Sequence, residues 1–179
     1  FSASPDVREY VNTSAVPDNS GQDIGQRLRG TITAPVTGTY TFWISCDDVG
    51  ELWVGSSASR FTKHRIITPH GATPSLNWDV YPWQRSMSVS LVAGQRYWFE
   101  ALAKQSNGND HLQIAWEYPG QGRQLIPGQY LNAPLADPND SDDNGLPDQW
   151  EQANHITSGE GGDPDGDGLG NYEEFLYGS

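Results

Sequence analysis

The chain has 179 residues and a mass of 19.7 kDa; 35% of its residues are hydrophobic, 11% are aromatic, and its formal net charge is −13. This length suits one ordinary domain plus a small appendage, since domains most often contain ~100–150 residues, and the aromatic content suits a packed core and excludes a disordered chain. No apolar run approaches the ~20 residues of a membrane span, and the negative charge repels phosphate backbones, so we expect neither membrane insertion nor nucleic-acid binding.

Alternating apolar and polar residues predict strands from residue 26 onward. Residues 26–33 and 39–45 alternate on either side of a Pro-Val-Thr-Gly turn, which predicts a hairpin. Further strands are predicted at 51–54, 65–67, 87–91, 97–102 and 112–116. About seven short strands predict a mainly β protein built as an antiparallel β-sandwich. The connection 68–86 is long for a sandwich, and long loops of this kind are often functional.

No side-chain pattern predicts an enzyme. The single cysteine, Cys46, cannot form an internal disulfide, and its neighbours Asp47 and Asp48 disfavour a thiolate, so we expect a buried apolar residue. The sequence contains no nucleophile elbow, P-loop or zinc-protease motif. We expect solvent-exposed positions on the β surface for all four histidines, which are His64, His70, His111 and His155. We expect packing roles for the strand tryptophans, which are Trp43, Trp53, Trp98 and Trp116.

The C-terminal segment carries nearly all of the net negative charge of the chain. Residues 137–179 contain 12 acidic and no basic side chains, whereas residues 1–136 contain 11 acidic and 10 basic ones. The proline-containing stretch 132–136 is predicted to be a linker between a sandwich at 1–131 and a second module at 137–179. The helical candidates of the second module are 147–156 and 171–177.

Acidic and amide residues recur in this module at the spacing of a calcium loop. Such a loop needs oxygen ligands at alternate positions, a glycine at the sixth position and a glutamate at the twelfth. Two matches occur in tandem, 23 residues apart, with Gly145 and Gly168 at the sixth positions. The sequence therefore predicts two Ca²⁺ ions. The predicted ligands of the first loop are Asp140, Asp142, Asn144, the carbonyl of Leu146, Asp148 and Glu151, and those of the second are Asp163, Asp165, Asp167, the carbonyl of Leu169, Asn171 and Glu174.

Prolines leave no room for a helix before Asp140, unlike in a standard EF-hand. The tail, above all residues 163–174, therefore resembles thrombospondin type 3-like and dockerin-like calcium repeats, which have a loop and an exiting helix only. That resemblance implies a calcium-stiffened spacer or a docking module.

The segment 26–55, which reads QRLRGTITAPVTGTYTFWISCDDVGELWVG, resembles the core of the PA14 domain, a sandwich module of bacterial toxins, glycosidases and adhesins. The segments 92–101, 109–116 and 126–128 continue the resemblance in the order of the family, so that it covers roughly residues 10–131. The family often has a further strand upstream, which would make this chain a piece of a longer protein.

The resemblance also implies a sugar site. Sugar-binding members of the family hold a calcium ion on two adjacent aspartates joined by a cis peptide, and Asp47 and Asp48 stand at that position. The third ligand of the family is an asparagine in a later loop, where Asn107, Asn109 and Asp110 are the candidates. The alternative for the pair is an ordinary acidic turn. A sugar also needs an apolar wall, for which the long loop offers Trp78, Tyr81 and Trp83 unless these rings fill the core.

These patterns together predict a secreted, extracellular and non-catalytic carbohydrate-binding (lectin-like) module of a multimodular bacterial enzyme or adhesin. Its expected partners are a glycan or polysaccharide and the neighbouring domains of a larger chain. Its expected cofactors are two Ca²⁺ ions in the tail and a third at Asp47 and Asp48. One alternative is a calcium-rigidified spacer or protein-interaction module, and another is a regulatory fragment of a hydrolase.

Overall fold

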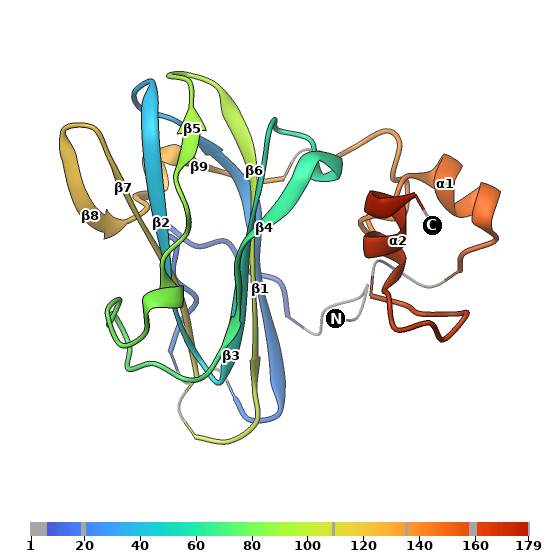
Figure 1. Ribbon diagram of the computed structural model, residues 1–179, viewed down its shortest axis with the longest axis horizontal. Coiled ribbons are helices and arrows are strands. Elements are labelled where there is room, and N and C mark those ends of the chain that lie inside the picture. The colour runs from blue at the N-terminus through green and yellow to red at the C-terminus, as the bar shows by residue number, and fades with distance from the viewer. Residues whose placement is uncertain (1–6, 19–20, 109, 135, 158–160, 179) are drawn as a thin grey trace. The chain divides into compact units, whose positions relative to one another are not determined.

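The computed structural model describes residues 7–18, 21–108, 110–134, 136–157 and 161–178 (Figure 1). The chain divides into two compact units, Tyr10–Pro134 and a second unit formed by 1–9 and 135–179. The described residues 7–9 thus group with the acidic tail, whereas the prediction placed them in the sandwich. Within this unit Arg8 and Asp143 approach to 3.8 Å as an exposed ion pair.

The described residues of the larger unit form nine strands in two antiparallel sheets, which confirms the mainly β sandwich (Figure 1). One sheet has the order β4-β3-β6-β1-β9 and the other β5-β2-β7-β8. The strands are β1 (Ile24–Thr33), β2 (Gly38–Asp47), β3 (Val49–Gly55), β4 (Lys63–His70), β5 (Val89–Leu91), β6 (Arg96–Gln105), β7 (His111–Tyr118), β8 (Gln121–Leu125) and β9 (Leu131–Asn132). Three single turns of 3-10 helix accompany them, η1 (Arg60–Thr62), η2 (Pro82–Gln84) and η3 (Gly128–Tyr130).

The predicted hairpin between residues 26–33 and 39–45 is wrong. Both segments are strands, but β1 pairs with β6 and β9, while β2 pairs with β5 and β7 in the opposite sheet. The turn between them crosses from one sheet to the other, and the Tyr40 hydroxyl fixes it by donating to the Val36 carbonyl at 2.8 Å. Alternation shows which side chains face the core, but it does not specify the partner strand.

Strand boundaries differ from the prediction at the sheet edges. Strand β5 contains only three of the five predicted residues, and β4 continues to His70, so the long connection begins later than predicted. Strands β8 and β9 were not predicted, because the β8 sequence QGRQL has no apolar alternation and its side chains are mostly exposed. Asn132 belongs to β9 and pairs with Thr31, so the predicted linker 132–136 loses its first residue to the sheet.

The core lies between the sheets and is rich in aromatic rings. Tyr40 and Phe42 of β2 pack against Trp116 of β7, with ring centroids 5.5 and 6.4 Å apart. Cys46 is 3% exposed in the same core, as predicted, and burial, followed by the charges of Asp47 and Asp48, raises the pKa of its thiol to about 12.

All four strand tryptophans are at most 9% exposed, which confirms their packing role. Only Trp116 belongs to the described inter-sheet core, however. The other three lie against cationic side chains instead: Arg123 lies 5.1 Å from the centre of the Trp43 ring, Lys63 lies 5.5 Å from that of Trp53, and Arg60 lies 5.1 Å from that of Trp98. Such cation–π contacts bury an indole without placing it between the sheets.

The smaller unit contains two short helices, α1 (Asp148–Asn154) and α2 (Asn171–Tyr177), inside the predicted ranges 147–156 and 171–177. Their aromatic rings meet, because Trp150 and Phe175 lie 5.8 Å apart with planes at 75°. In the described part of the chain, no helix has the length and apolar character needed to span a membrane.

Candidate functional site

Three loop segments converge at one end of the sandwich, the lower end in Figure 1. They are the β2–β3 turn, the approach to β1 and the β6–β7 connection. Backbone hydrogen bonds join them: the Asp48 amide donates to the Lys104 carbonyl and the Asp23 amide to the Ser106 carbonyl, both at 3.0 Å. Residues far apart in the sequence therefore surround the Asp47–Asp48 pair.

The peptide bond between Asp47 and Asp48 is cis, as the resemblance implies. The Ser106 amide and hydroxyl both donate to the Asp48 carboxylate, at 2.9 and 2.7 Å, and these bonds lower the pKa of Asp48. Burial, followed by the adjacent Asp48 and then the charge of Asp110, raises the pKa of Asp47. A nearby cation would favour the charged form of both carboxylates.

The three candidates for a further calcium ligand differ in burial and in hydrogen bonding. Asn109 lies outside the described residues. Asp110 is fully buried, and its carboxylate accepts hydrogen bonds from the Gly21 amide at 3.3 Å and from the Gln26 side-chain amide, so it fastens the approach to β1. Asn107 is exposed beside Ser106 and is the accessible amide in the described part of this loop.

Two observations test whether a hard cation fits here. Within the described residues, neither Asp47 nor Asp48 forms an ion pair with a lysine or arginine. Gln105, which directly precedes Ser106, is 1% exposed, and its side-chain amide has no hydrogen-bond partner in the described structure. Uncompensated carboxylates beside an unpaired buried amide match the oxygen ligands that Ca²⁺ prefers. The residues present therefore fit the ion.

A buried polar network, which the sequence analysis missed, lies beside the Asp47–Asp48 pair at the end of β2. The ring of His111, opposite Asp47 in the β2–β7 register, lies with Nε2 3.2 Å from the Ser45 hydroxyl, which is 3.1 Å from the Thr73 hydroxyl. The predicted exposure of His111 is wrong: it is 4% exposed, and burial lowers its pKa. The position of His111 directly before the alternating run 112–116 predicts that it lies on a strand. It does not show which face of the sheet the His111 side chain occupies.

The same network anchors the long loop between β4 and β5. The Thr73 amide donates to the Cys46 carbonyl at 2.9 Å, and the Leu76 amide donates to the Gln113 side chain at 2.7 Å. The Gln84 side chain then donates to the Ile44 carbonyl at 2.9 Å. The loop therefore begins next to the aspartate pair and runs back along β2.

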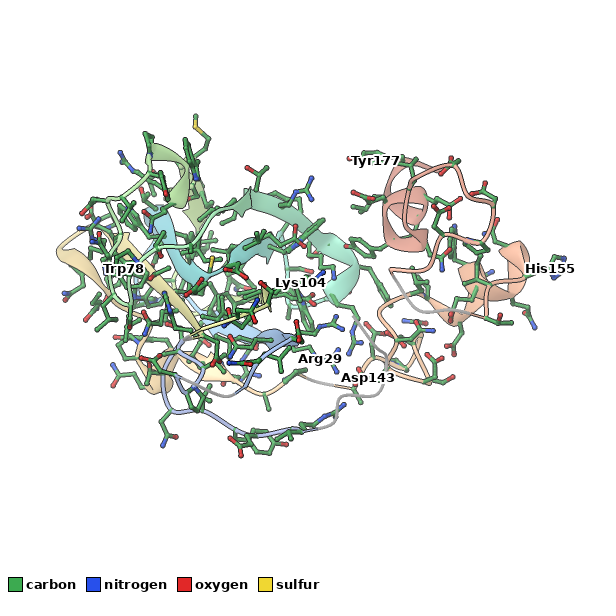
Figure 2. All side chains as sticks on the ribbon, turned by 90° about the horizontal axis from the view of Figure 1, so that it is seen from below. Arg29, Trp78, Lys104, Asp143, His155 and Tyr177 are labelled. Atoms are coloured by element: carbon green, nitrogen blue, oxygen red, sulfur yellow. The ribbon has the colours of Figure 1, made fainter. Side chains whose placement is uncertain are left out.

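The aromatic residues of this loop are only partly buried. Trp78 is half-buried at the edge of the sandwich, which Figure 2 views from below. Tyr81 and Trp83 stack face to face at 4.7 Å with planes 6° apart, and Trp83 is 44% exposed. Because Gln84 contacts Ile44, three residues before Asp47 on β2, the stacked pair lies on the order of 10 Å along the strand from the aspartates. These rings form a surface platform rather than core packing.

The two predicted calcium loops of the tail have equivalent structures. In each, the first aspartate accepts from the amide of the sixth-position glycine, Asp140 from Gly145 at 3.0 Å and Asp163 from Gly168 at 3.1 Å. The fifth residue accepts from the seventh-position leucine amide, at 2.9 Å for Asn144 and 2.8 Å for Asp167. The described residues 136–139, which precede Asp140, contain no helix, as predicted.

The equivalence extends through the exiting helices. The fourth residues have φ of 59° (Asp143) and 76° (Gly166), and Gly145 and Gly168 have φ of 101° and 94°, the left-handed conformation predicted for the sixth position. Each helix begins at the ninth position and ends at a left-handed cap, His155 or Gly178, whose amide donates to the carbonyl of the twelfth-position glutamate. Figure 2 labels Asp143 and His155, which belong to the first repeat.

Carboxylates crowd together in both loops. Oxygen atoms of Asp140, Asp142 and Asp148, and those of Asp163, Asp165 and Asp167, each lie within 4.8 Å of one another. Burial, followed by these charges, raises the pKa of Glu151 and Glu174. Residues 137–179 contain no lysine or arginine to compensate the crowding. The donor set therefore fits a hard divalent cation in each loop.

The first loop is the more enclosed. Asp140 is 4% exposed, Asn144 is 7% exposed and Leu146 is fully buried, whereas the first three aspartates of the second loop are exposed. The Asn144 amide also donates to Asp142 at 2.9 Å and to Glu151. These hydrogen bonds connect three of the predicted ligands of the first loop with one another.

The model of the PA14 domain family matches residues 2–129, and the chain belongs to this family. It is 28% identical over 141 residues to the mouse N-acetyl-beta-glucosaminyl-glycoprotein 4-beta-N-acetylgalactosaminyltransferase 1, covering 74% of this chain. It is 33% identical over 90 residues to dog (Canis lupus familiaris) fibrocystin, covering 45% of this chain. The chain spans only 13% and 2% of the lengths of these relatives.

Among solved structures, the chain is similar to the A domain of Epithelial Adhesin 6 from Candida glabrata in complex with Galb1-3GlcNAc. The two share 16% identity with a TM-score of 0.47, and the match covers 61% of this chain and 50% of the adhesin chain. The family assignment itself rests on the match of the family model.

Proposed function

We propose that this chain is a non-catalytic, calcium-dependent carbohydrate-binding module with a two-calcium tail. The observation that carries this proposal is the Asp47–Asp48 pair at the loop end of a PA14 sandwich, fixed by Ser106 and uncompensated by any cationic side chain in the described structure. In this proposal a calcium ion bound there coordinates vicinal sugar hydroxyls, as in the sugar-binding members that the sequence resembles.

The chain's own groups support both halves of a sugar site. The two carboxylates supply hard oxygen ligands, and Asn107 supplies an amide at the rim. The exposed face of the Tyr81–Trp83 stack offers the flat apolar surface that the C–H face of a sugar needs. Because Thr73, in the loop that carries this stack, donates a hydrogen bond to the Cys46 carbonyl, the platform and the metal site are positioned by one polar network.

We further propose one Ca²⁺ ion in each loop of the tail, in the manner of thrombospondin type 3-like repeats. The equivalent hydrogen bonds of the two loops, their crowded carboxylates and their shared left-handed positions support this. Calcium binding would supply the compensating charge and so contribute to the folding of the tail. Calcium-rich extracellular surroundings suit such sites, so we place the module outside the cell, as part of a larger multimodular protein.

A glycan screen in calcium and in chelator tests the proposal. Retention of one group of glycans in calcium and its loss in EGTA is the expected result. A blank screen in calcium, from protein shown to be folded, would overturn it.

A second candidate function has its own supporting observation. The tail repeats its structure position by position, which suits a calcium-stiffened spacer between domains. In that case the glycan screen stays blank, while calcium still orders residues 137–179.

A further inference from the structure

Asp18 carries a carboxylate near the candidate sugar site and is not one of the proposed calcium ligands. Asp18 is exposed in the segment before β1, and it accepts hydrogen bonds from the Gln113 side-chain amide at 3.4 Å and from the Ser75 hydroxyl at 3.5 Å. Gln113 lies opposite Ser45, two residues before Asp47 on β2. Asp18 is therefore held beside Ser75 of the aromatic loop, about two residues along β2 from the aspartate pair.

The electrostatic environment of His111 gives a second sign of this proximity. Burial lowers the pKa of His111, and the negative charges of Asp18, then Asp47, then Asp110 oppose this decrease. Since His111 lies directly opposite Asp47, the charge of Asp18 lies near the end of β2 that carries the pair.

The charges at this end do not balance even with a metal ion bound. Asp18, Asp47, Asp48 and Asp110 contribute four negative charges, and one Ca²⁺ neutralises two of them. In the described structure none of the four forms an ion pair with lysine or arginine. Lys104, whose carbonyl accepts a hydrogen bond from the Asp48 amide, alternates with the buried Ala103 and Gln105, so its side chain faces the outer side of its sheet.

We infer that Asp18 makes this site selective for neutral glycans over carboxylated or sulfated ones. The inference rests on the proposed sugar binding and adds its substrate class. An anionic sugar seated on the calcium would meet the residual negative charge of Asp18 at close range, without a compensating cation. Asp18 is a specificity residue, because the charge that it adds is not needed to hold the ion.

Matched glycan pairs test this inference on the full chain in calcium. The probes are a neutral oligosaccharide, the same oligosaccharide carrying a sulfate, and its uronic-acid counterpart. We expect the wild type to retain the neutral member about tenfold better than either anionic form. We expect this ratio to fall as salt is raised, because exposed charges are screened.

Asp18→Asn keeps the shape of the side chain and removes its charge. It should raise retention of the anionic forms about tenfold relative to that of the neutral form. The matched control is Glu117→Gln, which removes a charge from an exposed position on β7 opposite Thr41 and should change neither.

The outcomes separate the two claims. If no glycan is retained by folded protein, the proposed function fails. If neutral glycans are retained but the wild type holds anionic forms equally well, or Asp18→Asn behaves like Glu117→Gln, the inference about Asp18 is overturned and the sugar-binding proposal stands.

Discussion

Ser106 donates two hydrogen bonds to Asp48, one from its amide at 2.9 Å and one from its hydroxyl at 2.7 Å, across 58 residues of sequence. These bonds orient the carboxylate that the proposal assigns to calcium. We expect Ser106→Ala to weaken binding at this site by about tenfold, because residues that orient metal ligands typically contribute that much to affinity. Calorimetric calcium titration measures the loss.

The matched control for this variant is Ser90→Ala, an exposed serine on β5. It should leave every calcium site unchanged. Equal titrations for the two variants would show that Ser106 does not support a metal ligand.

Removing calcium should release the tail and leave the sandwich folded. The carboxylates of residues 137–179 have no lysine or arginine in that segment to offset their repulsion, whereas the sandwich is held by its own aromatic core. In EGTA we expect proteolytic cleavage within 137–179 and an intact Tyr10–Pro134 unit. A tail that resists cleavage equally with and without calcium would contradict this prediction.

The sixth-position glycines should be required for their own loops only. Gly168 has φ of 94° and open space where a side-chain carbon would stand, so the cost of Gly168→Val comes from backbone conformation alone. We expect it to remove calcium from the second loop and spare the first, and Gly145→Val to do the reverse.

Gly170→Ala is the matched control for the glycine variants, because Gly170 has an ordinary φ of −83°. Calcium titration should show two tail sites for this control and one for each valine variant. Loss of both sites in either valine variant would mean that the loops fold as one unit.

A buried ion network should govern acid stability. Glu100 is fully buried, pairs with Lys63 at 2.7 Å and with Arg27, and has a pKa of about 2 despite the opposing effect of burial. Because this pKa lies below its usual value, the network stabilises the fold above about pH 4.5, and this stability is lost as the pH falls towards 2.

Glu100→Gln should lower the free energy of unfolding at pH 7 by about 3 kcal/mol, since it leaves buried cations unpaired. It should also flatten the pH dependence between about 5 and 2. Chemical denaturation at each pH measures both effects. Glu51→Gln, which breaks the more exposed pair with Arg65, should cost at most about 1 kcal/mol. If Glu100→Gln kept the wild-type pH dependence of stability, Glu100 would not be the source of that dependence.

Local features of this fold could be predicted from the sequence, whereas long-range partners could not. The proposed ligands of each candidate calcium loop lie within twelve residues, so their spacing predicted the left-handed glycines and the start of α2 at Asn171. The partner of β1 is decided by packing across the sandwich, and alternation carries no information about it.

The candidate sugar site likewise combines residues that are adjacent in the sequence with residues that only the fold brings near. The adjacent pair Asp47 and Asp48 was visible in the sequence, but Ser106 and Thr73 reach it only through the folded chain. The burial of His111 depends on the side of β7 that it occupies beside Ser45, which its own neighbours in sequence do not determine.

Calcium-dependent sugar binding at Asp47 and Asp48 is tested most directly by comparing glycan retention by Asp48→Ala and Glu174→Gln across a calcium titration. Asp48→Ala removes a ligand from the sandwich site, and Glu174→Gln weakens only the second loop of the tail. We expect that Asp48→Ala retains no glycan at any calcium concentration, while Glu174→Gln retains glycans like the wild type. Calcium-independent retention by the wild type, or full retention by Asp48→Ala, would contradict it.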